Sequence, residues 1–478
     1  MSTRKALAFS YLDRYATLLI MLISSMIIAR LLSPAEMGVY SITVVLIGFM
    51  APFRDFGASQ YLIQQKELTT DSIRAIWAIQ LSFNWTLGLF IFSTRNLVAD
   101  FYHNSTISSI MAILAINSFL IPFGALTGAW LTRELRFDLL AIIRFSGTIV
   151  GTTTSILFAR SGHGSISLAY GALCSSITNA AVSLLFRPKH FPWLPGIKEI
   201  PRVMGFGSTI SGITILNQGY HGAPELILGK IQGMSSTGLF GRAQGLVNLL
   251  ERLLLDSVHA VALPSFSKMQ DDLPKLGDAF INSISILSVL GWTLLSFIAL
   301  MARPAITLLY GDQWLNAVTL TRILCISMNF MLLMSLSPPL LISIGHRMNV
   351  FWLMAFTAII QAIFVLIGGT IGLEGAGLAI TCASMIISSS WLYVAHLRVG
   401  FSLKNLIQNL MKSLLVTIGA MIVPMVVIIL YSLINPSATI PPLFIGGIGM
   451  ILGFVFSAKM IKHTIWEEIV RLINSLRS

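Results

Sequence analysis

Two consecutive apolar segments of the chain carry polar residues at the spacing of one helix face. The first stripe consists of Ser211, Thr214, Gln218, His221 and Glu225. The second stripe consists of Gln244, Asn248, Arg252, Asp256 and His259. Residues three or four positions apart share one face of an α-helix. Because polar groups inside a membrane are costly unless they face a cavity or a partner, the two stripes predict a water-filled lumen.

The carboxylates of these stripes could bind and release a coupling ion. Glu225 is the preferred candidate, because the nearest opposite charge along the sequence is Lys230, more than one helical turn away. Asp256 follows Arg252 by four residues, so these two side chains can instead neutralise each other on one helix face. We therefore expect ion coupling at Glu225 or Asp256, with an Arg252–Asp256 ion pair as the alternative for the second site.

The two histidines of the stripes, His221 and His259, are more typical of hydrogen-bonded packing residues than of proton carriers. Three residues that weaken a helix, Gly219, Gly222 and Pro224, lie near the end of the first stripe. Their position favours a hinge, which alternating access to a central lumen would need.

Cations outnumber acids among the charged groups that the sequence places in or near the lumen. These candidate substrate-binding cations are Arg30, Arg54, Lys230, Arg242 and Arg252. Asp13, Arg14 and Arg144 are expected at the cytoplasmic interface, where long side chains can reach water. Because arginine and lysine hold phosphate well in a medium of low dielectric constant, the excess of cations predicts an anionic substrate.

The composition requires a membrane protein. Of the 478 residues, 55% are hydrophobic and only 10% are charged, whereas an average soluble chain has about 25% charged residues. Cys174, Cys325 and Cys382 lie singly in apolar segments, so we expect neither disulfides nor a zinc site, and no cofactor. The first apolar run is interrupted by charges and is interpreted as an uncleaved span rather than a signal peptide.

A transmembrane helix needs about 20 apolar residues, and the chain offers fourteen such segments. They cover 10–32, 37–60, 73–94, 107–131, 138–159, 165–187, 203–224, 238–263, 280–302, 317–343, 349–370, 374–396, 411–434 and 440–461. With both termini in the cytoplasm, most loop Lys and Arg residues fall on the cytoplasmic side, as the positive-inside rule requires. Twelve or thirteen spans stay open as alternatives. An amphipathic segment, 466–476, follows the last span.

An internal repeat indicates two parallel halves. The stretch 30–40 aligns with 230–240, since each has a cation followed eight residues later by a Gly-apolar-aromatic triplet. We therefore predict a six-helix lobe over 1–187, a basic cytoplasmic connector over 188–202, a second six-helix lobe over 203–398, and two extra helices with a cytoplasmic tail over 399–478. Two lobes that face each other across a cavity are typical of a transporter.

Six short stretches, in order along the chain, resemble one known family. They are 29–40 (ARLLSPAEMGVY), 53–57 (FRDFG) with 62–64 (LIQ), 133–137 (RELRF), 238–243 (GLFGRA), 263–270 (LPSFSKMQ) and 309–314 (LYGDQW). The chain is similar to the polysaccharide and O-antigen exporters, a flippase family of the multidrug/oligosaccharidyl-lipid/polysaccharide flippase superfamily. Together with the helix count, the resemblance extends over nearly the whole chain.

The resemblance implies a multi-pass flippase in the bacterial inner membrane. Its substrate would be an undecaprenyl-pyrophosphate-linked oligosaccharide repeat unit for O-antigen or exopolysaccharide assembly, carried by alternating access in antiport with a proton or sodium ion. Arg30, Arg54 and the Gly-aromatic turns transfer position by position, whereas no motif transfers a coupling acid. Phe240 replaces the tyrosine that the family commonly has there. Membrane lipids and a polysaccharide polymerase or chain-length machinery are the implied partners.

Two other functions stay open. A multidrug or cation efflux antiporter of the same superfamily would need acids to dominate its cavity, and here cations do. A membrane glycan polymerase or acyltransferase is less favoured, because no catalytic motif and no long extramembrane loop stands out; we therefore expect no enzyme. The absence of a P-loop motif argues against ATP as the direct energy source. The net charge of +12 is explained by topology and lipid headgroups, so no nucleic-acid partner is expected.

Overall fold

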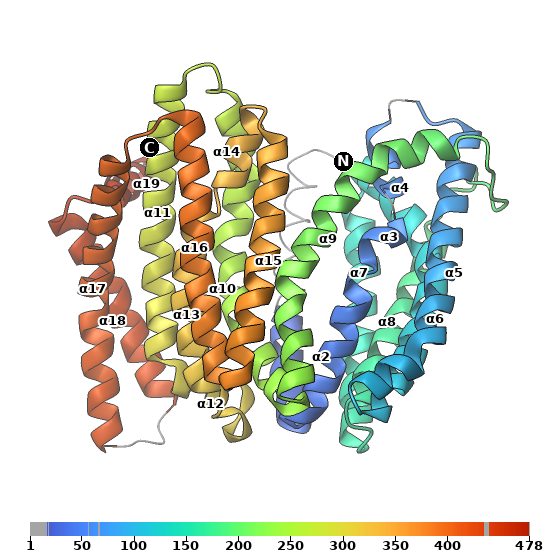
Figure 1. Ribbon diagram of the computed structural model, residues 1–478, viewed down its shortest axis with the longest axis horizontal. Coiled ribbons are helices and arrows are strands. Elements are labelled where there is room, and N and C mark those ends of the chain that lie inside the picture. Colours follow the sequence, from blue (N-terminus) through green and yellow to red (C-terminus); the bar gives the residue numbers. More distant parts are fainter. Residues whose placement is uncertain (1–16, 18, 56, 66, 435–438, 478) are drawn as a thin grey trace. The chain divides into compact units, whose positions relative to one another are not determined.

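The computed structural model describes residues 17, 19–55, 57–65, 67–434 and 439–477 (Figure 1). Side chains are described for these residues except 51, 55, 205–214, 256, 257, 260 and 472–477. Every element of the described residues is helical, which confirms the predicted all-α class. The chain divides into two compact units, Met1–Gly238 (unit 1) and Leu239–Ser478 (unit 2).

Unit 1 begins with the apolar helix Leu19–Leu31. It continues with α2 (Pro34–Gly48), α3 (Ala51–Asp55), α4 (Ala58–Gln64), α5 (Thr70–Phe101), α6 (Ser105–Arg133), α7 (Phe137–Arg160), α8 (Ile166–Leu185) and α9 (Ile200–Ile231). The helix α10 (Met234–Ser267) starts in unit 1 and runs on into unit 2.

Unit 2 contains the rest of α10 and ten further elements. These are α11 (Leu273–Leu300), α12 (Ala302–Tyr310), the short 3-10 helix η1 (Asp312–Trp314), α13 (Ala317–Met334), α14 (Ser337–Ser343), α15 (Arg347–Ile371), α16 (Leu373–Val399), α17 (Leu403–Ile434), α18 (Ile440–Met460) and α19 (Thr464–Arg477). The last of these contains the predicted amphipathic segment.

Ten helices of the described residues are long and apolar enough to cross a membrane. This confirms a multi-pass membrane protein, while the number of fourteen spans stays a prediction. One predicted span is wrong as a single helix. The segment 37–60 is broken into α2, α3 and α4, with Gly57 in the left-handed region at φ 74°. The segment 317–343 contains α13 and α14 and lies within one candidate span, Asp312–Ser343.

The start of α2 follows directly from the local sequence. Ser33 accepts a hydrogen bond from the backbone N–H of Glu36, and the Glu36 carboxylate accepts one from the backbone N–H of Ser33 at 2.7 Å. This reciprocal capping box satisfies two amides that a helix start leaves without partners, and Pro34 is preformed for the first turn. The conspicuous Ser-Pro-x-Glu sequence is therefore explained by helix capping.

Glycine allows two helix starts to cross at backbone contact within unit 1. A Cβ atom on Gly38 of α2 would overlap the carbonyl oxygen of Met234, and a Cβ atom on Gly238 would overlap that of Pro34. The two contacts are reciprocal, and they join equivalent positions of the predicted repeat. Such close approach is possible only where both residues lack side chains.

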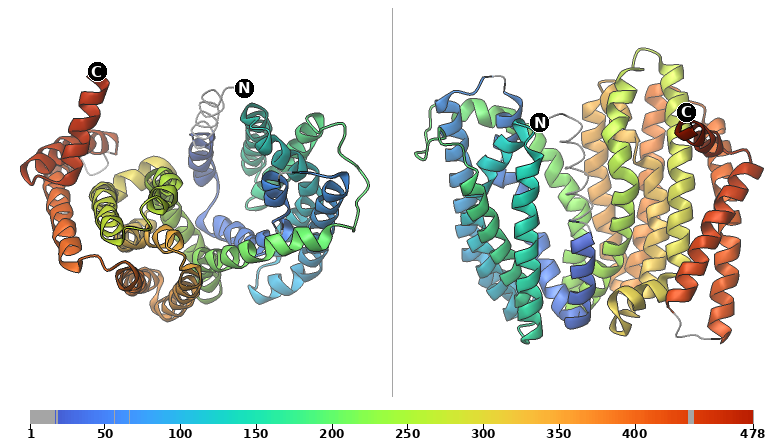
Figure 2. Two further views of the ribbon diagram at one scale, coloured as in Figure 1. Left: turned by 90° about the horizontal axis from the view of Figure 1, so that it is seen from above. Right: turned by 180° about the vertical axis from the view of Figure 1, so that it is seen from behind.

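The basic connector between α8 and α9 is fixed to unit 1 and runs along its outer edge (Figure 2). The indole N–H of Trp77 donates to the carbonyl of Trp193 at 2.9 Å, and the guanidinium of Arg187 lies 4.0 Å from the Trp193 ring centroid. Burial lowers the pKa of Arg187 from its ordinary value. Aromatic stacking therefore holds the start of the connector in place.

The boundary between the compact units lies after Gly238, whereas the sequence placed the lobe boundary at the connector. The physical reason is that α9 packs against α2, α4 and α5 of unit 1. The division into two pseudo-symmetric lobes over the predicted ranges stays a prediction.

A buried histidine joins the last helix, α19, to the rest of unit 2. His463, which is 1% exposed, precedes α19. Its Nε2 lies 2.9 Å from the Ser413 hydroxyl of α17 and 3.1 Å from the Ser285 hydroxyl of α11, and its Nδ1 accepts from the Ile465 N–H at 3.1 Å. Because Nδ1 is an acceptor here, the ring is neutral and carries its hydrogen on Nε2. Burial, and then the charge of Lys412, lower the pKa of His463 from 6.5 to about 4.

Acidification should weaken this junction. The unfolded chain takes up a proton at His463 near pH 6.5 and the folded chain only near pH 4. The neutral His463 therefore contributes fully to the free energy of unfolding above pH 6.5, and this contribution is lost as the pH falls towards 4. We expect the midpoint of thermal unfolding to fall more between pH 7.5 and 5 in the wild type than in His463→Asn, measured on detergent-purified protein. Equal pH slopes in the two proteins would show that His463 does not carry this dependence.

Candidate functional site

The first polar stripe lies on α9 and faces α2 within unit 1. Small residues bring the two helices together: Gly222 packs against Val45 and Phe49, and Gly48 packs against the Gln218 side chain. Glycines on both helices let polar side chains of one helix reach the other. The stripe therefore lies at a helix–helix contact for at least part of its length.

Glu225 has a partner that the sequence did not reveal. The hydroxyl of Ser41 on α2 donates a hydrogen bond to its carboxylate from 184 residues away. Lys230, the nearest cation in the sequence, instead donates to the backbone carbonyl of Phe101 at 2.6 Å and lies 4.3 Å from the ring centroid of the same residue. Glu225 is thus held by a neutral donor, an arrangement in which the carboxyl group can gain or lose a proton without breaking an ion pair.

Other members of the first stripe are less enclosed. His221 is exposed and stacks edge-on against Tyr220, with 4.8 Å between ring centroids. Ser211 and Thr214 belong to α9, but their side chains lie outside the described residues. Pro224 is accommodated inside α9, which continues to Ile231, so the helix passes through the predicted weak point without ending.

Arg54 lies where the predicted second span is broken. It occupies α3, a five-residue helix that packs against α5 and α9, and its side chain is half-buried. Asn84 of α5 donates to the carbonyl of Arg54 at 2.8 Å and also to that of Gln80 at 2.8 Å. This amide satisfies a carbonyl that the helix break would leave without a partner, and it fixes the backbone that carries the cation.

The second stripe lies on α10 in unit 2. Gln244 donates to the Asn248 side chain at 2.6 Å, and the Nε2 of His259 lies 3.2 Å from the carbonyl oxygen of Ser335. Arg252 is exposed. The side chain of Asp256 lies outside the described residues, so its predicted pairing with Arg252 and its role in ion coupling stay predictions.

The remaining cations have structural contacts. Arg242 of α10 lies over two aromatic rings of the stretch 309–314 (LYGDQW). Its guanidinium is 5.1 Å from the ring centroid of Tyr310 and 5.4 Å from that of Trp314. These rings belong to the α12–η1 corner, which the sequence analysis did not predict. Arg30 is exposed at the end of the helix Leu19–Leu31. Within unit 1, Arg54 lies on α3, whereas Arg30 and Lys230 lie at helix ends.

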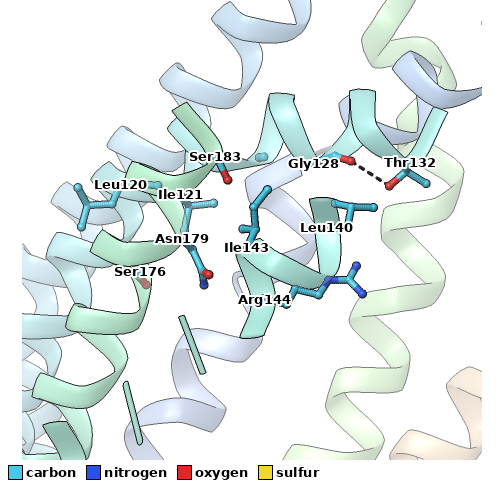
Figure 3. A pocket seen from close by; sticks show the side chains of 13 residues that line it. Leu120, Ile121, Gly128, Thr132, Leu140, Ile143, Arg144, Ser176, Asn179 and Ser183 are labelled. Atoms are coloured by element: carbon cyan, nitrogen blue, oxygen red, sulfur yellow. Dashed lines mark hydrogen bonds between the residues drawn. The ribbon is translucent and has the colours of Figure 1, made fainter. Parts of the chain in front are cut away.

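A pocket in unit 1 was not anticipated. It lies between α6, α7 and α8 and has a volume of about 310 Å³ (Figure 3). Its lining residues are Leu120, Ile121, Gly124, Ala125, Gly128, Thr132, Leu140, Ile143, Arg144, Ser176, Asn179, Ala180 and Ser183. Such a wall, mostly apolar with a few polar groups, is typical of a small-molecule site. The signal in the sequence was the spacing of Ser176, Asn179 and Ser183 on one face of α8.

No group of three or more His, Cys, Asp or Glu residues within the described part of the chain is arranged to hold a metal ion.

Sequence comparisons with known proteins point to polysaccharide biosynthesis proteins. The profile of a family described as polysaccharide biosynthesis protein matches residues 27–319. The lipopolysaccharide biosynthesis protein WzxC of Escherichia coli K12 is 22% identical over 311 residues, which are 64% of this chain and 62% of that protein. The succinoglycan biosynthesis transport protein ExoT of Rhizobium meliloti is 23% identical over 350 residues, or 72% and 70% of the two chains.

The fold is shared with solved membrane transporters. The lipid II flippase MurJ in an inward closed conformation superimposes with a TM-score of 0.78, over 96% of this chain and 99% of that one, at 14% identity. An inward-facing multidrug resistance MATE family transporter of the MOP superfamily gives a TM-score of 0.67, over 80% and 94% of the chains, at 15% identity. At these identities the likeness concerns the fold.

Proposed function

Because the chain belongs to the polysaccharide biosynthesis protein family, we propose that it is a flippase that carries a lipid-linked oligosaccharide across the bacterial inner membrane. The functions of two relatives, lipopolysaccharide biosynthesis and succinoglycan biosynthesis transport, support this class of substrate. The first relative is matched over 62% of its length. The fold, shared with a lipid II flippase, supports the same activity, and translocation requires no catalytic site.

The observation that carries the proposal is the broken second span. Discontinuous helices are typical of substrate sites in transporters, where freed backbone groups and side chains face a cavity. Here the break bears Arg54, and Asn84 holds its backbone. A half-buried cation at such a position suits an anionic group such as a pyrophosphate.

The proposed cycle uses the residues in two roles. The pyrophosphate and the first sugars enter from the cytoplasm, and cations neutralise the pyrophosphate, with Arg54 and Arg252 as the leading candidates. The polyprenyl tail stays in the lipid. Proton or sodium binding at Glu225, or at Asp256, then biases the carrier back to its first state, because an ion shifts a conformational equilibrium by its difference in affinity for the two states.

Complementation tests this function. A flippase-null strain that makes a defined repeat unit should regain surface polysaccharide and lose its accumulated lipid-linked intermediate when it expresses the wild-type chain. Failure with several repeat units, combined with increased resistance to cationic drugs, would instead support a multidrug efflux antiporter, the alternative that the sequence left open.

Charge reversal of the leading cations should abolish export in the complemented strain. In Arg54→Glu and Arg252→Glu a repulsion replaces an attraction to the pyrophosphate, so we expect surface polysaccharide to fall at least about tenfold with the protein still in the membrane. The matched control is Lys404→Glu, since Lys404 is exposed at the start of α17. Wild-type export from either variant would remove that residue from the substrate site.

A further inference from the structure

The pocket between α6, α7 and α8 carries a row of polar side chains along one helix. Ser176, Asn179 and Ser183 are spaced by three and four residues on α8, so they lie on one face, and all three line the pocket (Figure 3). The helix α8 is long and apolar enough to span the membrane. Polar side chains in such a helix normally bond across to a neighbouring helix or to their own backbone.

The hydrogen-bonding capacity of this row is unused by the described residues. The Oδ1 atom of Asn179 is buried and has no hydrogen-bond partner among them. The hydroxyls of Ser176 and Ser183 form no side-chain hydrogen bond in the described part of the chain, in contrast to Thr178 on the same helix, which donates to the Cys174 carbonyl at 2.8 Å. The Asn179 oxygen is packed against Gly147 of α7 and is closed off, so a ligand in the pocket would instead meet the amide nitrogen of Asn179 and the hydroxyls of Ser176 and Ser183. These groups offer the row's unused hydrogen-bonding capacity to a ligand.

Glycines shape both the pocket and the position of Asn179. A Cβ atom on Gly147 of α7 would overlap the amide group of Asn179, so the missing side chain at this position lets the amide lie against α7. Gly124 and Gly128 line the pocket on α6, and a Cβ atom on Gly128 would meet only Leu140, at 4.0 Å. The space is therefore built by several small residues on two helices.

The walls suit a ligand with one polar edge and one apolar face. The row on α8 lines the pocket together with Leu120, Ile121 and Ile143 from α6 and α7. A volume of about 310 Å³ is at the small end of the range for ligand sites, which is about 300–1,000 Å³. Arg144 lies at the edge, with its guanidinium directed away from Asn179 (Figure 3).

We propose that this pocket binds a single sugar ring of the transported head group, with its hydroxyls on Ser176, Asn179 and Ser183 and its carbon–hydrogen face on the apolar wall. This proposal rests on the proposed function and identifies the part of the molecule that recognises sugar. Pyranose rings combine a hydroxylated edge with an apolar face, which matches the two walls. The pyrophosphate of the same substrate binds elsewhere, at cations, so sugar recognition and anion recognition are separable.

Binding measurements on the purified full chain in detergent separate sugar recognition from pyrophosphate recognition. The probes are a short-chain prenyl pyrophosphate and the same lipid with glucose, galactose or N-acetylglucosamine attached. We expect at least one sugar to tighten binding about tenfold over the sugar-free probe, the equivalent of one or two net hydrogen bonds. Asn179→Leu should lose this gain and keep the affinity for the sugar-free probe, and Gly128→Leu should do the same by filling the pocket.

Thr178→Val is the matched control, because the Thr178 hydroxyl is already bonded to its own helix; this variant should bind all probes like the wild type. The pocket is overturned if Asn179→Leu and Gly128→Leu both keep the gain from the sugar, or if no sugar tightens binding while the sugar-free probe still binds. Binding of neither probe, together with failed complementation, contradicts the flippase function and the pocket together.

Discussion

Replacing Glu225 with glutamine should reduce export of the lipid-linked glycan about 5- to 150-fold, the range of typical coupling free energies. Glutamine keeps the size of the side chain and can still accept a hydrogen bond from Ser41, so the packing of α2 on α9 is preserved. What is lost is the ability to bind and release an ion. A permanently neutral side chain therefore slows the return of the carrier after substrate release.

The measurement is surface polysaccharide in the complemented strain, with the amount of protein in the membrane determined in parallel. Ser41→Ala tests the contact from the other side: it should also lower export, because the Glu225 carboxylate loses the donor that holds it in place. Glu468→Gln is the matched control, since Glu468 is exposed on α19 and pairs only with Arg471 in the described residues. Full export from Glu225→Gln would exclude this residue as the coupling acid.

Alanine at Gly38 or at Gly238 should both destabilise the protein and abolish export. In each variant the new methyl group would overlap a backbone carbonyl oxygen, of Met234 or of Pro34. A backbone atom cannot rotate away as a side chain would, so α2 must separate from the start of α10. We expect the free energy of unfolding to fall by about 3 kcal/mol, the upper end of the usual cost of overpacking.

Gly245→Ala provides the comparison, because a Cβ atom on this glycine of α10 meets nothing within 4 Å. Alanine is favoured over glycine inside a helix by about 1 kcal/mol, so this variant should be at least as stable as the wild type and should export normally. Thermal unfolding of the purified variants and surface polysaccharide in cells measure the two effects. If Gly38→Ala were as stable as the wild type, α2 and the start of α10 would have to be farther apart than in this structure.

Helix positions were predictable because membrane insertion depends on a local property. A segment of about 20 apolar residues needs no distant partner to become a helix in lipid. The predicted span 138–159 corresponds to α7, and 440–461 corresponds to α18, with ends that agree within one residue. The amphipathic segment 466–476 likewise lies within α19. In each case the signal is contained in the segment itself.

The helix break at Arg54 was not predictable in the same way. The segment 37–60 is apolar enough for one continuous helix, and the break depends on Gly57 in the left-handed region and on Asn84 of α5, which bonds the freed carbonyl of Arg54. The second requirement is tertiary, since Asn84 is thirty residues away. The sequence therefore placed Arg54 in a predicted helix, but the break in that helix depends on a tertiary contact that the segment itself does not contain.

The sequence alone determined the class of the protein, its family, and the faces on which its polar residues lie, because composition, motifs and the helical period are properties of single segments. Only the tertiary structure decided which group meets which: Ser41 with Glu225, Phe101 with Lys230, the Tyr310 and Trp314 rings with Arg242, and a row on α8 with a pocket. These choices depend on which helices pack together and where glycines let them approach. Packing of this kind couples residues up to 184 positions apart, so a local pattern cannot encode it by itself.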